Sequence, residues 1–246
     1  MLGVAVGLAL STAIDIHANL PLLCGSPADH LSLNRIAASW QFLLMINPPT
    51  TLALAWLTML VAMMTPLIAL PLAHVRASSL FARRWRASAG FLLGYFCIWG
   101  IAGMPLLLAA FFLRLVAGSV LVAFLLATLL ALVWSASPIQ QAAQNRAHRQ
   151  RRIGLFGLAA DRDCIMFGAA VGGWCLVSCW TWMLVPFFVP FGHVFAMIAV
   201  SGIVLAERLR GPGPVRWRTP VVLLPLVRRW GAFALHSLRG GEGSHV

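Results

Sequence analysis

The sequence predicts an all-α protein, a polytopic membrane helical bundle of about six transmembrane helices with both termini in the cytoplasm. Two observations carry this prediction. Of the 246 residues, 61% are hydrophobic and 10% are charged, whereas soluble domains carry about 25% charged residues. The apolar residues also form long continuous runs instead of alternating with polar ones, and an open sheet edge cannot lie in lipid.

Six segments are apolar enough to cross a bilayer, which takes roughly 20 helical residues. They are residues 2–22, 51–73, 88–112, 115–134, 165–187 and 191–208. The first has no basic region before it and no clear small-residue cleavage site after it, so we expect a retained span and not a signal peptide. Only Leu113 and Arg114 separate the third segment from the fourth, and Pro186 and Pro190 mark the turn between the fifth and sixth.

The positions of the basic residues predict the orientation. All 18 are arginines, and 16 of them fall in the loops 74–87 and 135–164 and in the segment after residue 207. Arg35 and Arg114 are the two on the opposite side. Because arginine accumulates on the cytoplasmic side of membrane proteins, we expect a multi-pass protein with cytoplasmic termini. The bilayer is thus the expected partner, and arginines placed in short blocks between apolar runs argue against nucleic acid.

This pattern divides the chain into a six-helix membrane domain, residues 1–210, and a cytoplasmic tail, residues 211–246. Within the tail, residues 219–231 are apolar, too short to span a bilayer, and flanked by arginine and tryptophan. Such a segment is typical of one that lies on the inner membrane surface.

Three further local features are predicted for the cytoplasmic side. Residues 135–149 could form an interfacial helix that opens at Ser137-Pro138, with the proline in its first turn. Asp161 and Asp163 are expected to cap the fifth span, because acidic groups favour helix N-termini. Glu207 is expected to pair with a cytoplasmic arginine.

Sulfur side chains repeat along the fifth span. Cys175, Cys179 and Met183 follow one another at intervals of four residues, so a helix places them on one face. The predicted topology puts this stripe between mid-membrane and the outer boundary. A C-x-x-x-C pair taken alone more often packs helices together, because free cysteine behaves as a small hydrophobe and small residues let helices approach closely.

Other soft ligands fall in the same outer half of the predicted bundle. They are Met59, Met63 and Met64 of the second span, His193 and Met197 of the sixth, and His17 of the first. Sulfur ligands select Cu(I) or Zn(II), whereas Mg²⁺ and Ca²⁺ need carboxylates, which are scarce here. The sequence therefore predicts a copper site, with Cu(I) favoured over zinc, while core filling by methionine is the alternative interpretation.

No enzyme motif accompanies these ligands. The sequence contains no Ser/His/Asp triad, no P-loop, no G-x-G-x-x-G and no paired carboxylate site. It therefore predicts a protein that is not an enzyme.

The stretch Trp56–Pro66, WLTMLVAMMTP, resembles the W-x-x-M-x-x-A-M-M-x-P signature of the bacterial predicted metal-binding integral membrane proteins, formerly a domain of unknown function. Further matches over roughly residues 45–210 are Phe91–Tyr95, Trp99, Ser137-Pro138, Asn145-Arg146, His148-Arg149, Cys175, Cys179-Trp180, Met183 and Glu207-Arg208. The resemblance implies a helical protein of the bacterial inner membrane with metal ligands at Cys175, Cys179, Met183, Met59, Met63 and Met64. Some members of this family are thought to supply copper to secreted copper oxidases such as tyrosinases.

Three functions follow from this reading of the sequence. The first is a metal-binding membrane protein that supplies copper to an extracytoplasmic copper enzyme or helps to assemble it. The second is an accessory subunit of a larger membrane complex without its own metal. The third is a small transporter, which ranks last because no inverted repeat or broken span is visible.

Overall fold

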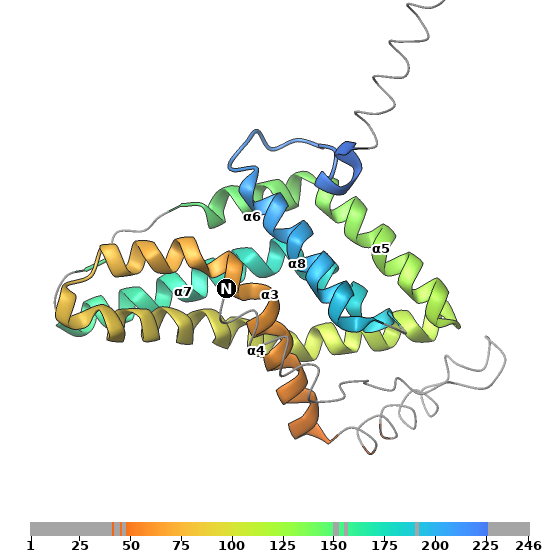
Figure 1. Cartoon of the computed structure of the whole chain (residues 1–246), viewed down its shortest axis with the longest axis horizontal. Helices are drawn as coiled ribbons and strands as arrows, with labels where there is room; N and C mark the ends of the chain where they lie inside the picture. The colour runs from red at the N-terminus through yellow and green to blue at the C-terminus, as the bar shows by residue number, and fades with distance from the viewer. Residues whose placement is uncertain are drawn as a thin grey trace, which may run out of the picture.

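The computed structural model describes residues 41, 45, 48–149, 153–154, 157–189 and 192–225, and every regular element among them is helical (Figure 1). The helices are α3 (Pro49–Ala77), α4 (Arg84–Ala117), α5 (Val120–Ala136), α6 (Pro138–Ala147), α7 (Gly157–Leu184) and α8 (His193–Leu209), with short 3₁₀ turns η2 (Phe81–Arg83), η3 (Val185–Phe188) and η4 (Val221–Leu223). The all-α prediction is confirmed for this part of the chain. The predicted first span, residues 2–22, lies outside the described residues.

Three helical segments are long and apolar enough to cross a membrane: Pro49–Ala77, Phe81–Ala117 and Gly157–Phe188. A fourth is added if α5 and α6, which meet at an angle of 67°, form one bent span. Helix α8 has 17 residues. The described helices therefore match the positions of the predicted segments, while the number of spans stays a prediction.

The turn between α4 and α5 differs from the predicted one. Helix α4 continues through Leu113 and Arg114 to Ala117, because both are good helix formers. It ends at Gly118, whose φ of 68° is the left-handed conformation common at helix C-termini. Ser119 then caps α5, since its hydroxyl accepts a hydrogen bond from the Val122 amide. The predicted break at residues 113–114 is thus wrong, and Arg114 is a buried residue of α4.

Helix α6 begins where the sequence predicted. The Ser137 hydroxyl accepts a hydrogen bond from the Gln140 amide at 3.2 Å, and Pro138 occupies the first turn. The helix packs against α7, and it buries Gln140, Gln141 and Gln144 against the rest of the protein. The expected interfacial helix therefore also forms a polar part of the interior.

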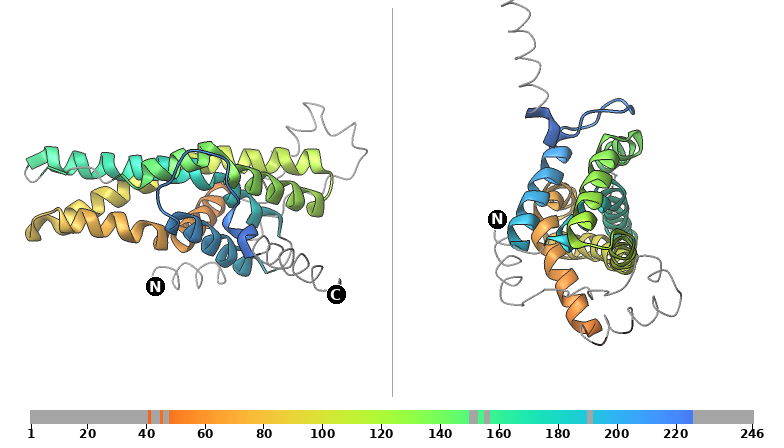
Figure 2. Two further views of the ribbon diagram at one scale, coloured as in Figure 1. Left: turned by 90° about the horizontal axis from the view of Figure 1, so that it is seen from above. Right: turned by 90° about the vertical axis from the view of Figure 1, so that its right-hand side faces the viewer.

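Helices α4 and α7 form the most extensive helix pair of the fold. They run in the same direction, since Arg83 contacts Asp161 near their first turns and Tyr95 contacts Cys175 further along. The first halves of α4 and α7 and the second half of α3 make one end of the elongated molecule, and α4 continues to the other end, toward which α5 and α8 lie (Figures 1 and 2). Helix α3 contains Pro66 and Pro71, residues that bend helices.

Tryptophans connect α5 to the second half of α7. The indole N–H of Trp134 donates to the Val177 carbonyl at 2.9 Å, and that of Trp182 donates to the Ser135 hydroxyl at 2.7 Å. These contacts hold the α5–α6 corner beside the segment of α7 that carries the sulfur stripe.

The acidic residues have other partners than those predicted. Asp161 lies in the second turn of α7, so it is not a cap; its carboxylate pairs with Arg83 at 2.5 Å and Arg86 at 3.0 Å. Asp163 accepts a hydrogen bond from the Gly154 amide. Glu207 is buried, and within the described residues it has no ion pair with an arginine; its carboxylate accepts hydrogen bonds from the Gln140 amide group and the Val221 backbone amide.

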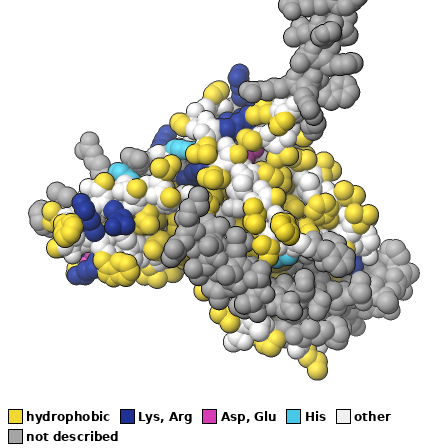
Figure 3. Space-filling model, viewed as in Figure 1, with side chains coloured by type: hydrophobic (Ala, Val, Ile, Leu, Met, Phe, Trp, Pro, Cys, Tyr) yellow, Lys and Arg dark blue, Asp and Glu magenta, His cyan; other side chains and the backbone are white. Residues whose placement is uncertain are grey.

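The outer surface of the helices is largely apolar. Figure 3 shows apolar side chains over much of one face, with arginines gathered in a few places. On α5, an exposed stripe repeats every four residues: Leu121, Leu125, Leu129 and Val133, each more than half exposed. Contiguous exposed apolar surface of this kind is typical of a face that another apolar phase covers.

Candidate metal centre

The sulfur stripe of α7 lies in the protein interior. Cys175, Cys179 and Met183 are at most 2% exposed, and their spacing puts them on one side of an uninterrupted helix. The sulfur atoms of Cys175 and Cys179 are 4.0 Å apart. The three side chains therefore lie on one helix face, as predicted, and both thiols face the interior of the bundle.

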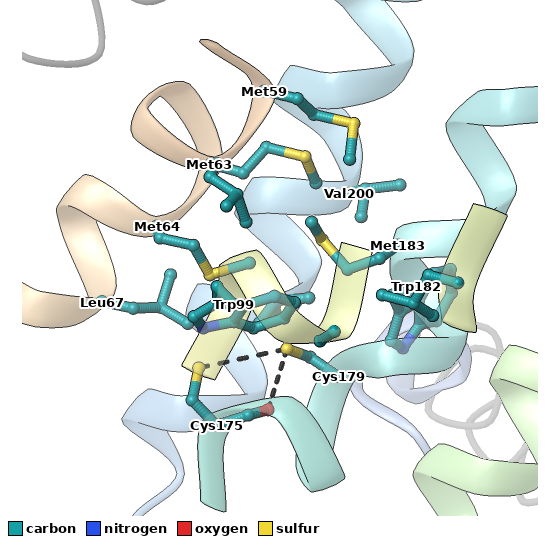
Figure 4. Close-up of a cluster of buried hydrophobic side chains, with 14 of the residues drawn as sticks. Met59, Met63, Met64, Leu67, Trp99, Cys175, Cys179, Trp182, Met183 and Val200 are labelled. Carbon is teal, nitrogen blue, oxygen red and sulfur yellow. Dashed lines mark hydrogen bonds between the residues drawn. The ribbon is translucent and has the colours of Figure 1, made fainter. Parts of the chain in front are cut away.

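The two thiols differ in their hydrogen bonds. The Cys179 thiol donates to the Cys175 carbonyl at 2.9 Å, as shown by a dashed line in Figure 4. The Cys175 sulfur accepts a hydrogen bond from the hydroxyl of Tyr95 at 3.4 Å. Tyr95 belongs to α4 and is fully buried, so this contact fixes the first cysteine against the neighbouring helix.

Methionines of α3 face the same region. Met59, Met63 and Met64 are buried; Met59 and Met63, four positions apart, share one helix face, and Met64 lies beside them. In Figure 4 these methionines and Met183 lie on one side of the two cysteines, with the Trp99 side chain drawn between the methionines and the thiols. The Met63 carbonyl accepts a hydrogen bond from Ser201 of α8 at 3.2 Å, which ties this turn of α3 to α8. The structure thus brings α3 and α7 sulfurs into one buried cluster.

The ligands predicted in the first and sixth spans are Met197, His193 and His17, and they differ in their surroundings. Met197 of α8 is buried and belongs to the same apolar core. His193, the first residue of α8, is half-buried, and its Nδ1 lies 3.0 Å from the Pro186 carbonyl in η3. His17 lies outside the described residues. Among the residues that the structure describes, no group of three or more His, Cys, Asp or Glu side chains is placed to hold a metal ion.

A small cavity with both polar and apolar lining residues adjoins Cys179. It has a volume of about 10 Å³, room for about one water molecule. Its lining consists of Leu67, Gln140, Gln144, Ser178, Cys179, Trp182, Val204, Glu207 and Arg208. Cys179 is therefore level with the last turns of α8 and with α6, both of which were predicted at the cytoplasmic side. The sequence had placed the cysteine pair in the middle and outer half of the membrane.

The geometry of the thiol pair suits a soft metal ion. A metal–thiolate bond is about 2.3 Å long, as in zinc sites. Two such bonds separate the sulfur atoms by about 3.8 Å at a tetrahedral angle and about 4.6 Å when they are collinear. The observed 4.0 Å lies between these limits. The surrounding thioethers are neutral soft donors, and this combination fits Cu(I) better than a hard cation.

Sequence reasoning did not assign Tyr95, Gln140 or Arg208 to the site, although Tyr95 and Arg208 lie in stretches that match the family. Tyr95 is the single tyrosine of the chain, and a hydroxyl inside an apolar run needs a polar partner when it is buried. The isolated tyrosine hydroxyl could therefore have indicated a buried polar contact. Gln140 and Arg208 gave no such signal, because their approach to Cys179 depends on how α6 and α8 pack.

The comparisons with known proteins add one match. Residues 53–230 match the family model PpoB2, which is described as a copper chaperone. The matched segment includes α4 to α8 and most of α3, and hence both cysteines and all the methionines of the cluster. Neither the comparison with curated proteins nor that with solved structures gave a match.

Proposed function

Because the chain belongs to the PpoB2 copper chaperone family, we propose that it is a membrane-embedded protein that binds Cu(I) and supplies it to an extracytoplasmic copper enzyme. The family gives the chain an accessory role in copper handling. The observation that carries the finer proposal is the buried pair of thiols, 4.0 Å apart, in a core that also contains the methionines of α3 and α7.

In this proposal Cys175 and Cys179 are the principal ligands, as two thiolates. Thiolates are charged and bind Cu(I) more strongly than neutral thioethers do. Met64, Met63 and Met183 then offer weaker sites through which the ion leaves by exchange of one sulfur ligand for another. Met59 lies nearest the start of α3, the end that the predicted topology places outside. The sulfur cluster would thus lead copper from the thiol pair toward the outer surface.

Membrane insertion is supported by the surface of the fold. Three helical segments have the length and composition of spans, and the exposed leucines of α5 need an apolar surrounding. The parallel course of α4 and α7 also agrees with the predicted topology, in which both cross from the cytoplasmic side outward.

The test is copper retention by the purified protein and by the double variant Cys175→Ser/Cys179→Ser. The wild type, loaded with Cu(I) under reducing conditions and washed with a weak chelator, should keep about one copper per chain, and the double variant should lose it. A matched control is Cys164→Ser, since Cys164 is an equally buried cysteine of α7 and does not contact the pair.

Copper retention by the double variant equal to that of the wild type would contradict the proposal. A wild type that holds no copper and co-purifies with other membrane subunits would instead favour the accessory-subunit function.

A further inference from the structure

Arg208 is a charged residue beside the thiol pair whose role the proposed copper site leaves unexplained. It lies near the end of α8 and lines the cavity beside Cys179. Its Nη2 donates a hydrogen bond to the Ala147 carbonyl at 3.1 Å. Its Nη1 is buried and has no hydrogen-bond partner within the described part of the chain. A guanidinium with an unsatisfied buried N–H group is costly unless another group interacts with it.

A second unsatisfied atom lies on the same cavity wall. Gln140 is 2% exposed; its Nε2 donates to Glu207, while its Oε1 has no partner among the described residues. The cavity has room for about one water molecule. A water that accepts from Arg208 and donates to Gln140 would satisfy both atoms directly beside the Cys179 sulfur.

The charge of the metal complex decides what this arginine does. Two thiolates carry two negative charges, so their complex with Cu(I) has a net charge of −1. The same two thiolates with Zn(II) form a neutral complex. An uncompensated charge in an apolar interior is strongly unfavourable, and a nearby opposite charge offsets that cost.

Glu207 lines the cavity as well, and its carboxylate has polar partners of its own. Its carboxylate accepts hydrogen bonds from Gln140 and from the Val221 amide of the tail. Burial lowers the pKa of Arg218, a neighbouring residue of the tail, and Arg210 lowers it further, whereas the charge of Glu207 raises it. The charge of Glu207 therefore acts on Arg218, and Arg208 is the arginine that lines the cavity together with Cys179.

We propose that Arg208 is the counter-charge of a copper(I) bis-thiolate at Cys175 and Cys179, so that the site prefers a monovalent ion to a divalent one. This proposal rests on the proposed function. Arg208 does not bind the metal itself; it acts on the complex through charge and through the water that it shares with Gln140. The structure thereby links the choice of metal to a residue at the opposite end of the chain from the methionine signature.

The test compares two metals in the detergent-purified protein. Cu(I) and Zn(II) affinities are measured by competition with chelators of each ion for the wild type, Arg208→Gln and Arg208→Lys. Loss of a group around the ligands typically weakens metal binding by about 10- to 100-fold. We expect Arg208→Gln to weaken Cu(I) binding by at least about tenfold and Zn(II) binding by less than about threefold, and Arg208→Lys to restore most of the Cu(I) affinity. The matched control is Arg210→Gln, whose guanidinium binds the Thr219 carbonyl and does not line the cavity.

A second variant is expected to change the Cu(I) affinity in the opposite direction. Glu207→Gln removes the negative charge from the cavity wall and should strengthen Cu(I) binding relative to Zn(II). Asp163→Asn, at a carboxylate that accepts a hydrogen bond from Gly154 and does not line the cavity, should change neither affinity.

Equal losses of both metals in Arg208→Gln, or weaker Cu(I) binding in Glu207→Gln, would overturn the role of Arg208 and leave the thiol site intact. If Arg208→Gln does not fold, Glu207→Gln alone decides, because stronger Cu(I) binding relative to Zn(II) supports the proposal and weaker Cu(I) binding contradicts it. Failure of the wild type to bind Cu(I) would instead contradict the proposed function.

Discussion

The two halves of α7 pack in different ways. Its first half touches α4 backbone to backbone: a Cβ atom added to Gly168 would lie 2.0 Å from the Phe91 carbonyl oxygen, and one added to Gly94 would lie 2.1 Å from the Ile165 carbonyl oxygen. Its second half is surrounded by long side chains, among them the methionines of α3. Where the second half begins, a Cβ added to Gly172 would lie 3.1 Å from the Tyr95 carbonyl oxygen, a looser approach to α4, and one added to Gly173 would meet no atom within 4 Å.

This difference suits the proposed task of each half. Backbones in direct contact cannot slide without clashes, so the first half fixes the register of α7 against α4. Methionine side chains are flexible and fill space in several conformations, so the second half can rearrange its sulfur ligands. Exchange of a metal between neighbouring sulfurs requires both a fixed helix position and ligands that can move.

The largest expected effect is that of Gly168→Ala. The added methyl group cannot fit beside the Phe91 carbonyl, so the two helices must separate. We expect the free energy of unfolding in detergent to fall by about 3 kcal/mol, the upper range for overpacked sites. Gly173→Ala, five residues along the same helix, is the control and should change stability by less than about 1 kcal/mol. Similar losses in both variants would show that the close approach at Gly168 does not hold the pair together.

Met183→Leu should have a smaller effect on stability and a different effect on copper. Leucine has nearly the volume of methionine, and such exchanges cost less than about 1.5 kcal/mol in cores. The thioether is lost, however, so copper transfer from the loaded protein to an external Cu(I) chelator should slow by several-fold. Thermal unfolding and transfer kinetics of the same preparation measure the two effects. Destabilisation as large as that of Gly168→Ala would mean that the second half of α7 is packed as rigidly as the first.

Local signals in the sequence were sufficient for much of the fold. The continuous apolar runs predicted the helices, and Ser137-Pro138 predicted the start of α6 because a capping hydroxyl and a first-turn proline act within four residues. The break after α4 was misplaced because hydropathy alone does not end a helix. The Gly118-Ser119 pair does end it, and was the better signal.

Contacts between helices were harder to predict. The interval of four residues put the sulfurs of α7 on one face, but the same spacing suits ordinary packing, and only the fold brings α3 to it. Gly90-x-x-x-Gly94 and Gly168-x-x-x-Gly172 are small-residue motifs that could have indicated the α4–α7 pair. The cavity beside Cys179 had no sequence signal, because α6, α7 and α8 each contribute to it from distant parts of the chain.

The smallest expected effect is that of Asp161→Asn, at the end of the α4–α7 pair. Asp161 bridges Arg83 and Arg86, but all three side chains are partly exposed, and exposed ion pairs contribute about 0–1 kcal/mol. We expect a loss of less than about 1 kcal/mol that shrinks further in 1 M salt, where charges are screened within about 3 Å. Chemical unfolding at low and high salt measures both values. If Asp161→Asn destabilised the protein as much as Gly168→Ala, charge pairing at the helix ends, and not the contact between glycine and backbone, would hold α4 and α7 together. A small and salt-sensitive loss would instead assign the pairing of α4 with α7 to the glycines.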